Sequence, residues 1–370
     1  MENNNVVKKT YLYKKHIALG SKMVTYSGFI MPLQYKSSIV EHMHVRNHSG
    51  IFDISHMGKI FLKGKDSKKI IQFLTTNDIN HIKIGQAQYN CMVNHKGGII
   101  DDLVIYKISE TEFLLIVNAI NTEKNKKWIN HYIHIKKYKN INIIDYSNDY
   151  SILSVQGPRS LDLIQNLTNI SLNMINFYHF KIGKFSGIEN LLISRTGYTG
   201  SKGVEIIIPN EYVEIVWDNI LKISNNIIPC GIASRDSLRL EMGYRLYGND
   251  ISDDITPIEA GLSWIIKFDK EFIAKEILKK QKIEGVQKKL LSFIVNKTGK
   301  IPRSGYPIVL CNNYIIGNVT SGGFSPILKK GIGLGYVNKN KLTKNSSIYI
   351  LIRNEKIPIS KVKLPFINNP

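Results

Sequence analysis

Long hydrophobic runs are missing from this sequence of 370 residues. No stretch approaches the roughly 18 consecutive apolar residues of a membrane-spanning helix, so we expect no membrane-embedded part. Residues 1–16, MENNNVVKKTYLYKKH, show neither the apolar core of a signal peptide nor the Arg- and Ser-rich pattern of a transit peptide. We therefore expect a cytoplasmic protein that does not bind a membrane.

Cysteine is also scarce. The three cysteines, Cys91, Cys230 and Cys311, are odd in number and widely spaced. This pattern argues against a disulfide framework and against the paired cysteines of a zinc site. We expect three reduced thiols.

Acidic residues and arginine are the other shortages. Asp and Glu number 29 against 50 for Lys and Arg, which gives a net charge of +21, and only 8 of those 50 are Arg. The lysines form small scattered groups without interleaved aromatic residues, so the charge does not indicate nucleic-acid binding. Four of the arginines, at 195, 235, 239 and 245, fall in a lysine-poor region. Because Arg presents a planar fork suited to carboxylates, this grouping indicates specific pairing.

Metal-site and nucleotide-site patterns are absent as well. His42, His44, His48 and His56 lie close together in the sequence, but no Glu stands between them as in HExxH, and no Cys or carboxylate cluster lies nearby. The glycines of GIGLGYV, residues 331–337, lack a strand–GxGxxG–helix context. We expect neither a metal nor a nucleotide.

The patterns that are present predict a mixed α+β chain of two or more domains, since one core usually stops growing at roughly 250–300 residues. The predicted strands are 113–118, 151–155, 191–194, 204–209 and 290–295, and the predicted helices are 121–134, 211–224 and 234–243. The lysine-rich segment 275–289 has few apolar residues after Leu278, and we place a domain boundary near residue 285. Beyond it, short strands punctuated by Gly and Pro predict a small barrel or sandwich.

Two adjacent carboxylates interrupt an apolar strand in GGIIDDLVIY, residues 97–106. The two glycines predict a turn, after which Asp101 and Asp102 point to opposite faces. Because the Asp101 face ends at Lys107 and the Asp102 face carries no other charge, we expect Asp102 to be the desolvated carboxylate, a kind of group that often serves chemistry. The alternative is structural: one Asp satisfies the turn and the other pairs with a lysine.

The segment SRTGYTGSKGVEI, residues 194–206, offers glycines for close backbone approach, Tyr198 for stacking and Glu205 at the start of a strand. A carboxylate can accept two hydrogen bonds from a ring edge with adjacent N–H donors, as in guanine or a pterin. The alternative for Glu205 is a strand-edge salt bridge with an arginine of the same region.

Residues 230–251, CGIASRDSLRLEMGYRLYGNDI, predict a loop followed by a helix that Ser234 opens and Gly243 closes. Arg235 and Arg239 lie four residues apart on one helical face. At least one of them is available to a ligand if Asp236 or Glu241 pairs with the other.

Eight motifs in sequence order, covering about residues 8 to 365, resemble the glycine cleavage T-protein family of tetrahydrofolate-dependent aminomethyltransferases. They are IFDISHMGKI, GQAQYNCMVNHKGGIIDDLVIY, LIVNAIN, LSVQGPRS, SRTGYTGSKGVEI, ASRDSLRLEMGYRLYGNDI, TPIEAGLSWIIKFDK and TSGGFSP.

The resemblance implies an α+β fold with three lobes arranged as a cloverleaf around a central folate-binding hole. Residues 1–284 would form the folate-binding region, with its second lobe inserted around residues 55–145, and residues 285–370 the C-terminal β-barrel domain. The implied reaction takes the aminomethyl group from the lipoyl arm of the H-protein and gives 5,10-methylenetetrahydrofolate, ammonia and dihydrolipoyl H-protein. Tetrahydrofolate is the co-substrate, no metal or nucleotide takes part, and we expect a monomer.

The resemblance also assigns site residues. Asp102 matches the essential aspartate of the family, and the folate-site pattern falls on Met57, Tyr89, Asn118, Tyr198, Glu205 and Arg235. The chain departs from the family at Ser201-Lys202, where many relatives have an acidic pair. It also ends in LPFINNP, without the terminal tyrosine that some relatives contribute to the folate tail.

Three alternative functions remain open. The first is the folate-binding part of a demethylating dehydrogenase, although 370 residues filled by these motifs leave no room for its flavin domain. The second is the folate-binding protein of iron–sulfur assembly, whose KGCYxGQE-like segment is missing. The third is a non-catalytic, basic nucleic-acid-binding protein, in which we would expect Asp102, Glu205 or Arg235 to be replaced.

Overall fold

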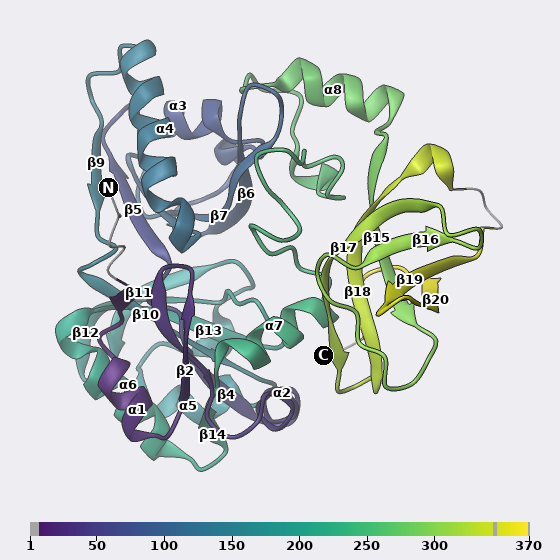
Figure 1. The fold of residues 1–370 in the computed structure, drawn as a ribbon. Helices are drawn as coiled ribbons and strands as arrows, with labels where there is room; N and C mark the ends of the chain where they lie inside the picture. Colours follow the sequence, from purple (N-terminus) through teal and green to yellow (C-terminus); the bar gives the residue numbers. More distant parts are fainter. Residues whose placement is uncertain (1–6, 343–345, 369–370) are drawn as a thin grey trace, which may run out of the picture. The chain divides into compact units, whose positions relative to one another are not determined.

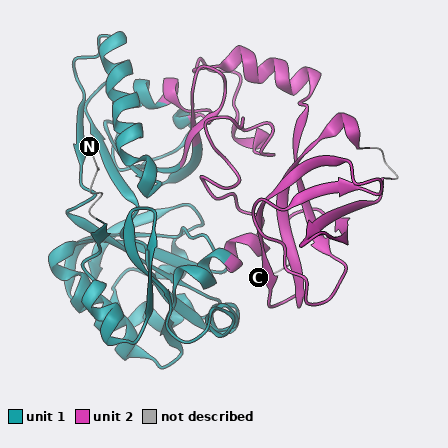
Figure 2. Cartoon of the chain, viewed as in Figure 1, with its two compact units in different colours: residues 1–71, 79–90, 103–236 teal, residues 72–78, 91–102, 237–370 magenta. Residues whose placement is uncertain are grey.

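The fold is described from a computed structural model for residues 7–342 and 346–368. Residues 1–6 lie outside this description. The prediction that the segment 1–16 is not a leader peptide falls partly on them. The chain forms two compact units (Figure 2): unit 1 comprises Met1–Ile71, Ile79–Asn90 and Leu103–Asp236, and unit 2 comprises Gln72–Asp78, Cys91–Asp102 and Ser237–Pro370. None of the helices in the described ranges is long and apolar enough to cross a lipid bilayer.

Helices and strands alternate along the chain (Figure 1), which confirms the mixed α+β class. The α-helices are α1 Tyr13–Ala18, α2 Ser38–Asn47, α3 Ser67–Leu74, α4 Thr122–Ile135, α5 Ser160–Ile164, α6 Val213–Ile223, α7 Ile232–Glu241 and α8 Lys275–Glu284. The strands are β1 Lys8–Lys9, β2 Lys22–Tyr26, β3 Phe29–Gln34, β4 Ser49–Asp53, β5 Gly58–Lys63, β6 Ala87–Val93, β7 Ile99–Lys107, β8 Glu112–Val117, β9 Asn142–Asp145, β10 Tyr150–Gln156, β11 Phe180–Phe185, β12 Ile188–Ser194, β13 Gly203–Pro209, β14 Ile227–Pro229, β15 Lys288–Val295, β16 Pro307–Leu310, β17 Ile315–Ser325, β18 Lys330–Asn338, β19 Ile348–Ile352 and β20 Glu355–Lys361.

A six-stranded sheet with the order β11-β12-β13-β10-β4-β14 lies at the centre of unit 1. Val204, Ile206 and Ile208 of β13 are fully buried and join one hydrophobic cluster with Trp217 of α6. Because side chains alternate along a strand, Glu205 points to the opposite face of this sheet. Formation of the core therefore turns the Glu205 carboxylate away from it.

A second sheet has the order β6-β7-β8-β5-β9, and helix α4 packs on β5. Strand β7 follows the predicted glycine turn, in which Gly97 has a φ of +83° and its N–H donates to the Asn94 carbonyl at 3.0 Å. A left-handed φ of this kind favours glycine, which explains the residue at that position.

The prediction that Asp102 is the desolvated member of the acid pair is wrong. Asp101 is fully buried, whereas Asp102 is only partly buried. The alternation of faces was predicted correctly, but Lys107 did not mark the exposed face. Its side chain is buried. This burial is tolerated because Nζ donates to the Ile82 carbonyl at 3.3 Å and pairs with Glu110 at 2.8 Å.

The C-terminal strands close into a barrel with the order β15-β18-β17-β16-β19-β20. Of the two predicted architectures, barrel and sandwich, the barrel is confirmed. Its interior is filled by alternating apolar residues such as Phe293, Ile308 and Ile350, all fully buried. The predicted domain boundary near residue 285 falls between α8 and β15 and stays a prediction, as does the arrangement of lobes around a hole.

The helix predicted to open at Ser234 begins two residues earlier, at Ile232. Ser234 is not the N-cap: its hydroxyl donates to the Gly231 carbonyl at 2.8 Å and contacts the Glu41 carboxylate at 3.2 Å. The predicted end is confirmed, since α7 stops at Glu241 and Gly243 has a φ of +68°.

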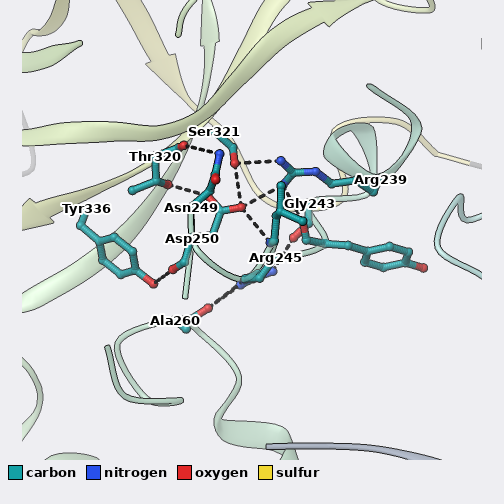
Figure 3. Close-up of polar contacts among 11 residues, drawn as sticks. Arg239, Gly243, Arg245, Asn249, Asp250, Ala260, Thr320, Ser321 and Tyr336 are labelled. Atoms are coloured by element: carbon teal, nitrogen blue, oxygen red, sulfur yellow. Dashed lines mark hydrogen bonds and ion pairs between the residues drawn. The ribbon is translucent and has the colours of Figure 1, made fainter. Parts of the chain in front are cut away.

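A buried ion pair joins the end of α7 to the barrel within unit 2 (Figure 3). Arg239 Nη1 lies 2.8 Å from Asp250 Oδ2, and both side chains are almost fully buried. The hydroxyls of Thr320 and Ser321, from β17, donate to the same carboxylate at 2.5 and 2.8 Å. Arg239 therefore pairs with Asp250, a partner that the sequence did not predict.

Replacing Asp250 with Asn should destabilise unit 2. The change keeps the shape of the side chain but removes the carboxylate charge beside a buried guanidinium, which typically costs about 3–5 kcal/mol. Urea unfolding should therefore show a large fall in the midpoint. The exposed Asp254 offers the matched control Asp254→Asn, for which we expect a change below about 0.5 kcal/mol. Equal shifts for both variants would contradict the importance of the pair.

Candidate functional site

Glu205 stands in the middle of a row of polar side chains across the six-stranded sheet. Its Cα partners are Ser194 on β12 and Ser154 on β10. Residues directly opposite one another in antiparallel strands point to the same face, so these three side chains are neighbours. The register thus forms a polar strip on the face that turns away from the core.

Hydrogen bonds hold the Glu205 carboxylate in place. Thr196 Oγ1 lies 2.6 Å from Oε2, and Ser154 Oγ makes only a long contact of 3.5 Å with Oε1. Glu205 makes no ion pair with any residue in the described ranges, so the alternative of a salt bridge with an arginine is not realised there. Because each carboxylate oxygen has two lone pairs, Glu205 keeps acceptor capacity for a ligand.

Tyr106 lies behind this strip and contacts the same threonine, with 3.1 Å between its hydroxyl and Thr196 Oγ1. Burial, together with the nearby Glu205 charge, raises the pKa of Tyr106 well above its usual value. The phenol therefore stays protonated and neutral at ordinary pH.

Gln156 holds the loop that carries Tyr198 through two hydrogen bonds. The Gln156 amide donates to the Thr196 carbonyl at 3.2 Å, and its Oε1 accepts from Thr199 Oγ1 at 2.9 Å. A Cβ atom at Gly197 would lie 2.1 Å from that same Oε1, so any other residue there would displace the Gln156 amide. The loop is a fixed platform for the Tyr198 ring.

Arg235 and Tyr198, both predicted from the sequence, are brought together. The Arg235 guanidinium carbon lies 5.0 Å from the centroid of the Tyr198 ring, which is a cation–π arrangement. Nη1 of Arg235 is buried and makes no hydrogen bond with the described residues. A buried donor without a partner is costly, and a ligand acceptor would remove that cost.

The turn between β4 and β5 carries Met57 and rests on a buried polar network. Asp53 Oδ2 lies 2.9 Å from His16 Nε2, and Ser55 donates to Asp53 Oδ1 through both its N–H and its hydroxyl. Burial alone would raise the pKa of Asp53, but the hydrogen bond and charge of His16 outweigh it and hold that pKa at about 2. The ionised Asp53 fixes the start of the turn.

His56, beside Met57 in this turn, is a buried neutral imidazole. Burial lowers its pKa to about 4, and the Arg235 charge adds to the effect. Its ring lies edge-on to Tyr26 and Phe29, with centroid distances of 5.7 and 6.3 Å. The histidine therefore adds no positive charge near Arg235 at neutral pH.

Met57 and Asn118 leave the second sheet at the same end. Met57 precedes Gly58 and Asn118 follows Val117, and Gly58 and Val117 are Cα partners. Tyr89 lies on β6 and Asp102 on β7.

Of the seven site residues predicted from the sequence, Asp102 belongs to unit 2 and the other six to unit 1. All seven are partly buried, neither in a core nor fully exposed. Those six are Met57, Tyr89, Asn118, Tyr198, Glu205 and Arg235.

Sequence reasoning missed Arg46, Glu41 and Gln156, whose side chains hold the site segments. Arg46 is one of only eight arginines, and that scarcity was the available signal. Nothing local marks Glu41 or Gln156, because their partners lie far along the chain.

A metal centre was not expected, and no group of three or more His, Cys, Asp and Glu residues in the described ranges could hold a metal ion. The rings of His44 and His48 lie 4.9 Å apart on α2, and His44 Nε2–H donates to the Asn226 carbonyl at 3.0 Å. The histidine spacing that resembles a metal site is thus used in packing.

Chemically, unit 1 offers an acceptor pair on Glu205, an aromatic face on Tyr198 and a buried donor on Arg235. This set suits a flat heterocycle whose edge carries N–H donors and whose substituent carries an acceptor. A pterin with a carbonyl-bearing side chain has both features, so the residues present fit a folate.

Two family models match the chain. The GCVT N-terminal domain covers residues 12–270, and the glycine cleavage T-protein C-terminal barrel domain covers residues 288–368. An aminomethyltransferase of Flavobacterium psychrophilum is 46% identical over 362 residues, which are 97% of this chain and 99% of that protein. An aminomethyltransferase of Halothermothrix orenii is 43% identical over 365 residues, covering 98% of this chain and 100% of that protein.

A solved structure agrees with these sequence matches. The glycine cleavage system aminomethyltransferase T from Bartonella henselae superposes with a TM-score of 0.90 at 30% identity, covering 98% of each chain. Family models, full-length relatives and fold therefore point the same way, and this chain belongs to the glycine cleavage T-protein family of aminomethyltransferases.

Proposed function

We propose that this enzyme transfers the methylene carbon of an aminomethyl group, carried on the lipoyl arm of the H-protein, to tetrahydrofolate. The products are 5,10-methylenetetrahydrofolate, ammonia and dihydrolipoyl H-protein. Tetrahydrofolate supplies the two nitrogens that capture the carbon. The two hydrogens that leave those nitrogens end on the departing ammonia and on the lipoyl sulfur, so the atoms balance.

One observation carries the proposal. Glu205 keeps acceptor capacity, and in the same unit Arg235 lies over Tyr198 with a buried N–H donor that no residue in the described ranges satisfies. We assign Glu205 to the N3–H and 2-amino group of the pterin and Tyr198 to its ring face. Arg235 would bind a carbonyl or carboxylate of the folate. The two-acceptor geometry of a carboxylate matches two adjacent N–H donors.

Asp102 is assigned the catalytic role. A carboxylate near the reacting nitrogens would orient the nucleophilic amine and stabilise the positive charge that develops as ammonia leaves. Partial burial strengthens such a charge interaction compared with water, because the local dielectric constant is lower. Its fully buried neighbour Asp101 is assigned no contact with substrate.

The remaining predicted residues are assigned to folate binding. Met57 would form an apolar wall, and Asn118 and Tyr89 would add polar contacts from neighbouring segments. The carbon stays at the oxidation level of formaldehyde throughout, so the chemistry requires no redox cofactor, and we propose that neither a metal nor a nucleotide takes part. We further propose a cytoplasmic monomer, without a nucleic-acid or membrane partner, whose folate-binding region ends near residue 284.

Replacing Asp102 with Asn should separate catalysis from binding. The amide keeps the shape but removes the charge, so kcat should fall at least about 100-fold, as for loss of other transition-state charge contacts. The tetrahydrofolate Kd should change less than about threefold. The assay follows 5,10-methylenetetrahydrofolate and ammonia formed from aminomethyl-lipoyl H-protein. Asp254→Asn, at the exposed aspartate, serves as the control for loss of a charge. Unchanged turnover in Asp102→Asn would remove the assigned role.

Replacing Glu205 with Gln should weaken folate binding. One oxygen becomes an NH₂ that faces the pterin donors, and loss of a charge-assisted contact of roughly 1.5–3 kcal/mol predicts a Kd about 10- to 100-fold higher. Calorimetric titration with tetrahydrofolate measures the change. Glu189→Gln is the matched control, because Glu189 is exposed on the adjacent strand β12 and, among the residues that the structure describes, pairs only with Lys184, at 3.2 Å. Equal affinities for the two variants would reject the assignment.

A further inference from the structure

Helix α2 of unit 1 carries two charged side chains that are buried and directed at different segments. Glu41, in its first turn, is fully buried, and the side chain of Arg46, in its last turn, is nearly so. An acid near a helix N-terminus and a cation near its C-terminus both interact favourably with the helix dipole. That interaction stabilises α2 but does not explain why both side chains reach across to other parts of the unit.

Glu41 holds the start of α7. Its Oε2 accepts from the Gly231 N–H at 2.8 Å and lies 3.2 Å from the Ser234 hydroxyl, while Oε1 accepts from the Tyr35 N–H at 2.6 Å. The carboxylate therefore joins the N-termini of α2 and α7.

Gly231 also fixes this junction sterically. A Cβ atom there would lie 2.2 Å from the Leu33 carbonyl oxygen of β3, so the start of α7 packs directly on that strand. Arg235 follows in the first turn of α7, and its N–H donates to the Gly231 carbonyl at 3.2 Å. The backbone position of Arg235 thus depends on the junction at Glu41.

Arg46 holds the loop of Tyr198. Its Nη1 donates to the Thr199 carbonyl at 2.6 Å and lies 3.0 Å from the Ser201 hydroxyl. Thr199 directly follows Tyr198, so this anchor holds the backbone one residue beyond the ring. The Ser201 hydroxyl is thus a neutral acceptor for Arg46.

The two anchored segments meet where the Arg235 guanidinium lies over the Tyr198 ring, 5.0 Å from its centroid. We propose that Glu41 and Arg46 are positioning residues through which α2 sets the geometry of the Arg235–Tyr198 pair for the folate ring. The proposal rests on the proposed function, because it takes that pair as part of the folate site. Neither anchor contacts the reacting atoms in this scheme, so their loss should act on folate binding and leave the chemical step intact.

The primary test is Arg46→Met, which removes the donors but keeps an apolar stem. Misplacement of binding groups by about 1 Å can cost as much as about 100-fold. We expect the KM for tetrahydrofolate to rise about 10- to 30-fold, with kcat within about twofold of wild type. Arg46→Lys restores a cationic donor and should recover most of the affinity. Arg159→Met, at an exposed arginine of the same unit, is the matched control and should leave KM unchanged.

A double-mutant cycle with Tyr198→Ala separates positioning from a general structural effect. If Arg46 acts through Tyr198, Arg46→Met should change KM less than about twofold in the Tyr198→Ala background. Equal effects of Arg46→Met in both backgrounds would overturn the inference. If Tyr198→Ala itself leaves KM unchanged, the proposed folate role of Tyr198 fails instead, so the two failures are distinguishable.

Two further variants guard against loss of folding in Arg46→Met. Ser201→Ala removes one acceptor of Arg46 without exposing a buried charge, and it should raise KM about threefold. Glu41→Gln turns one carboxylate oxygen into an NH₂, so that the N–H donor of residue 35 or of residue 231 loses its acceptor. This variant should raise KM in wild type but not in an Arg235→Met background. A fall in kcat with unchanged KM in either variant would contradict positioning for folate.

Discussion

Burial of carboxylates is the constraint on which much of this structure depends. A desolvated carboxylate is tolerated only where donors or a cation surround it. Glu41 joins the N-termini of two helices, Asp53 pairs with His16 beneath the turn of Met57, and Asp250 ties Arg239 to the barrel. In a chain with 29 acidic against 50 basic residues, these few acids lie at junctions between segments that are distant in sequence.

The site itself follows from the two-faced character of a sheet. One face of the six-stranded sheet packs against the hydrophobic core around Trp217. On the other face, the strand register places Ser194, Glu205 and Ser154 in a row. The polar strip needs no special backbone, because strand alternation and pairing produce it. What it does need is a rigid platform for Tyr198, and Gln156 supplies this from a neighbouring strand.

The sequence predicted the elements well where local pattern governs. The strand at 204–209, the helix at 121–134, the turn at Gly97 and the C-terminal β domain were all recognisable from periodicity and turn residues. The motifs resembling a known family placed Tyr198 and Arg235 in the same site, and the structure brings them into contact. No local pattern could have established that contact, since the two residues lie on separate segments.

The failures have a common physical cause. Lys107 was taken as the mark of an exposed face, yet Ile82 and Glu110 supply its buried ammonium with partners. Ser234 was taken as a cap, yet Glu41, almost two hundred positions earlier, serves the start of that helix. The Ile82 carbonyl and the Glu41 carboxylate reach these residues through tertiary structure, and a lysine or serine does not show in the sequence which distant group it will meet.

The anchors of this protein mostly bind main-chain atoms. Glu41 accepts from backbone N–H groups, Arg46 and Gln156 donate to backbone carbonyls, and Arg245 and Lys270 do the same in unit 2. A peptide group is present whatever side chain its residue carries. The residues next to these anchors can therefore be replaced by lysine, asparagine or isoleucine while the hydrogen bonds to the backbone persist. Sequence divergence at the surface then leaves the contacts between segments in place.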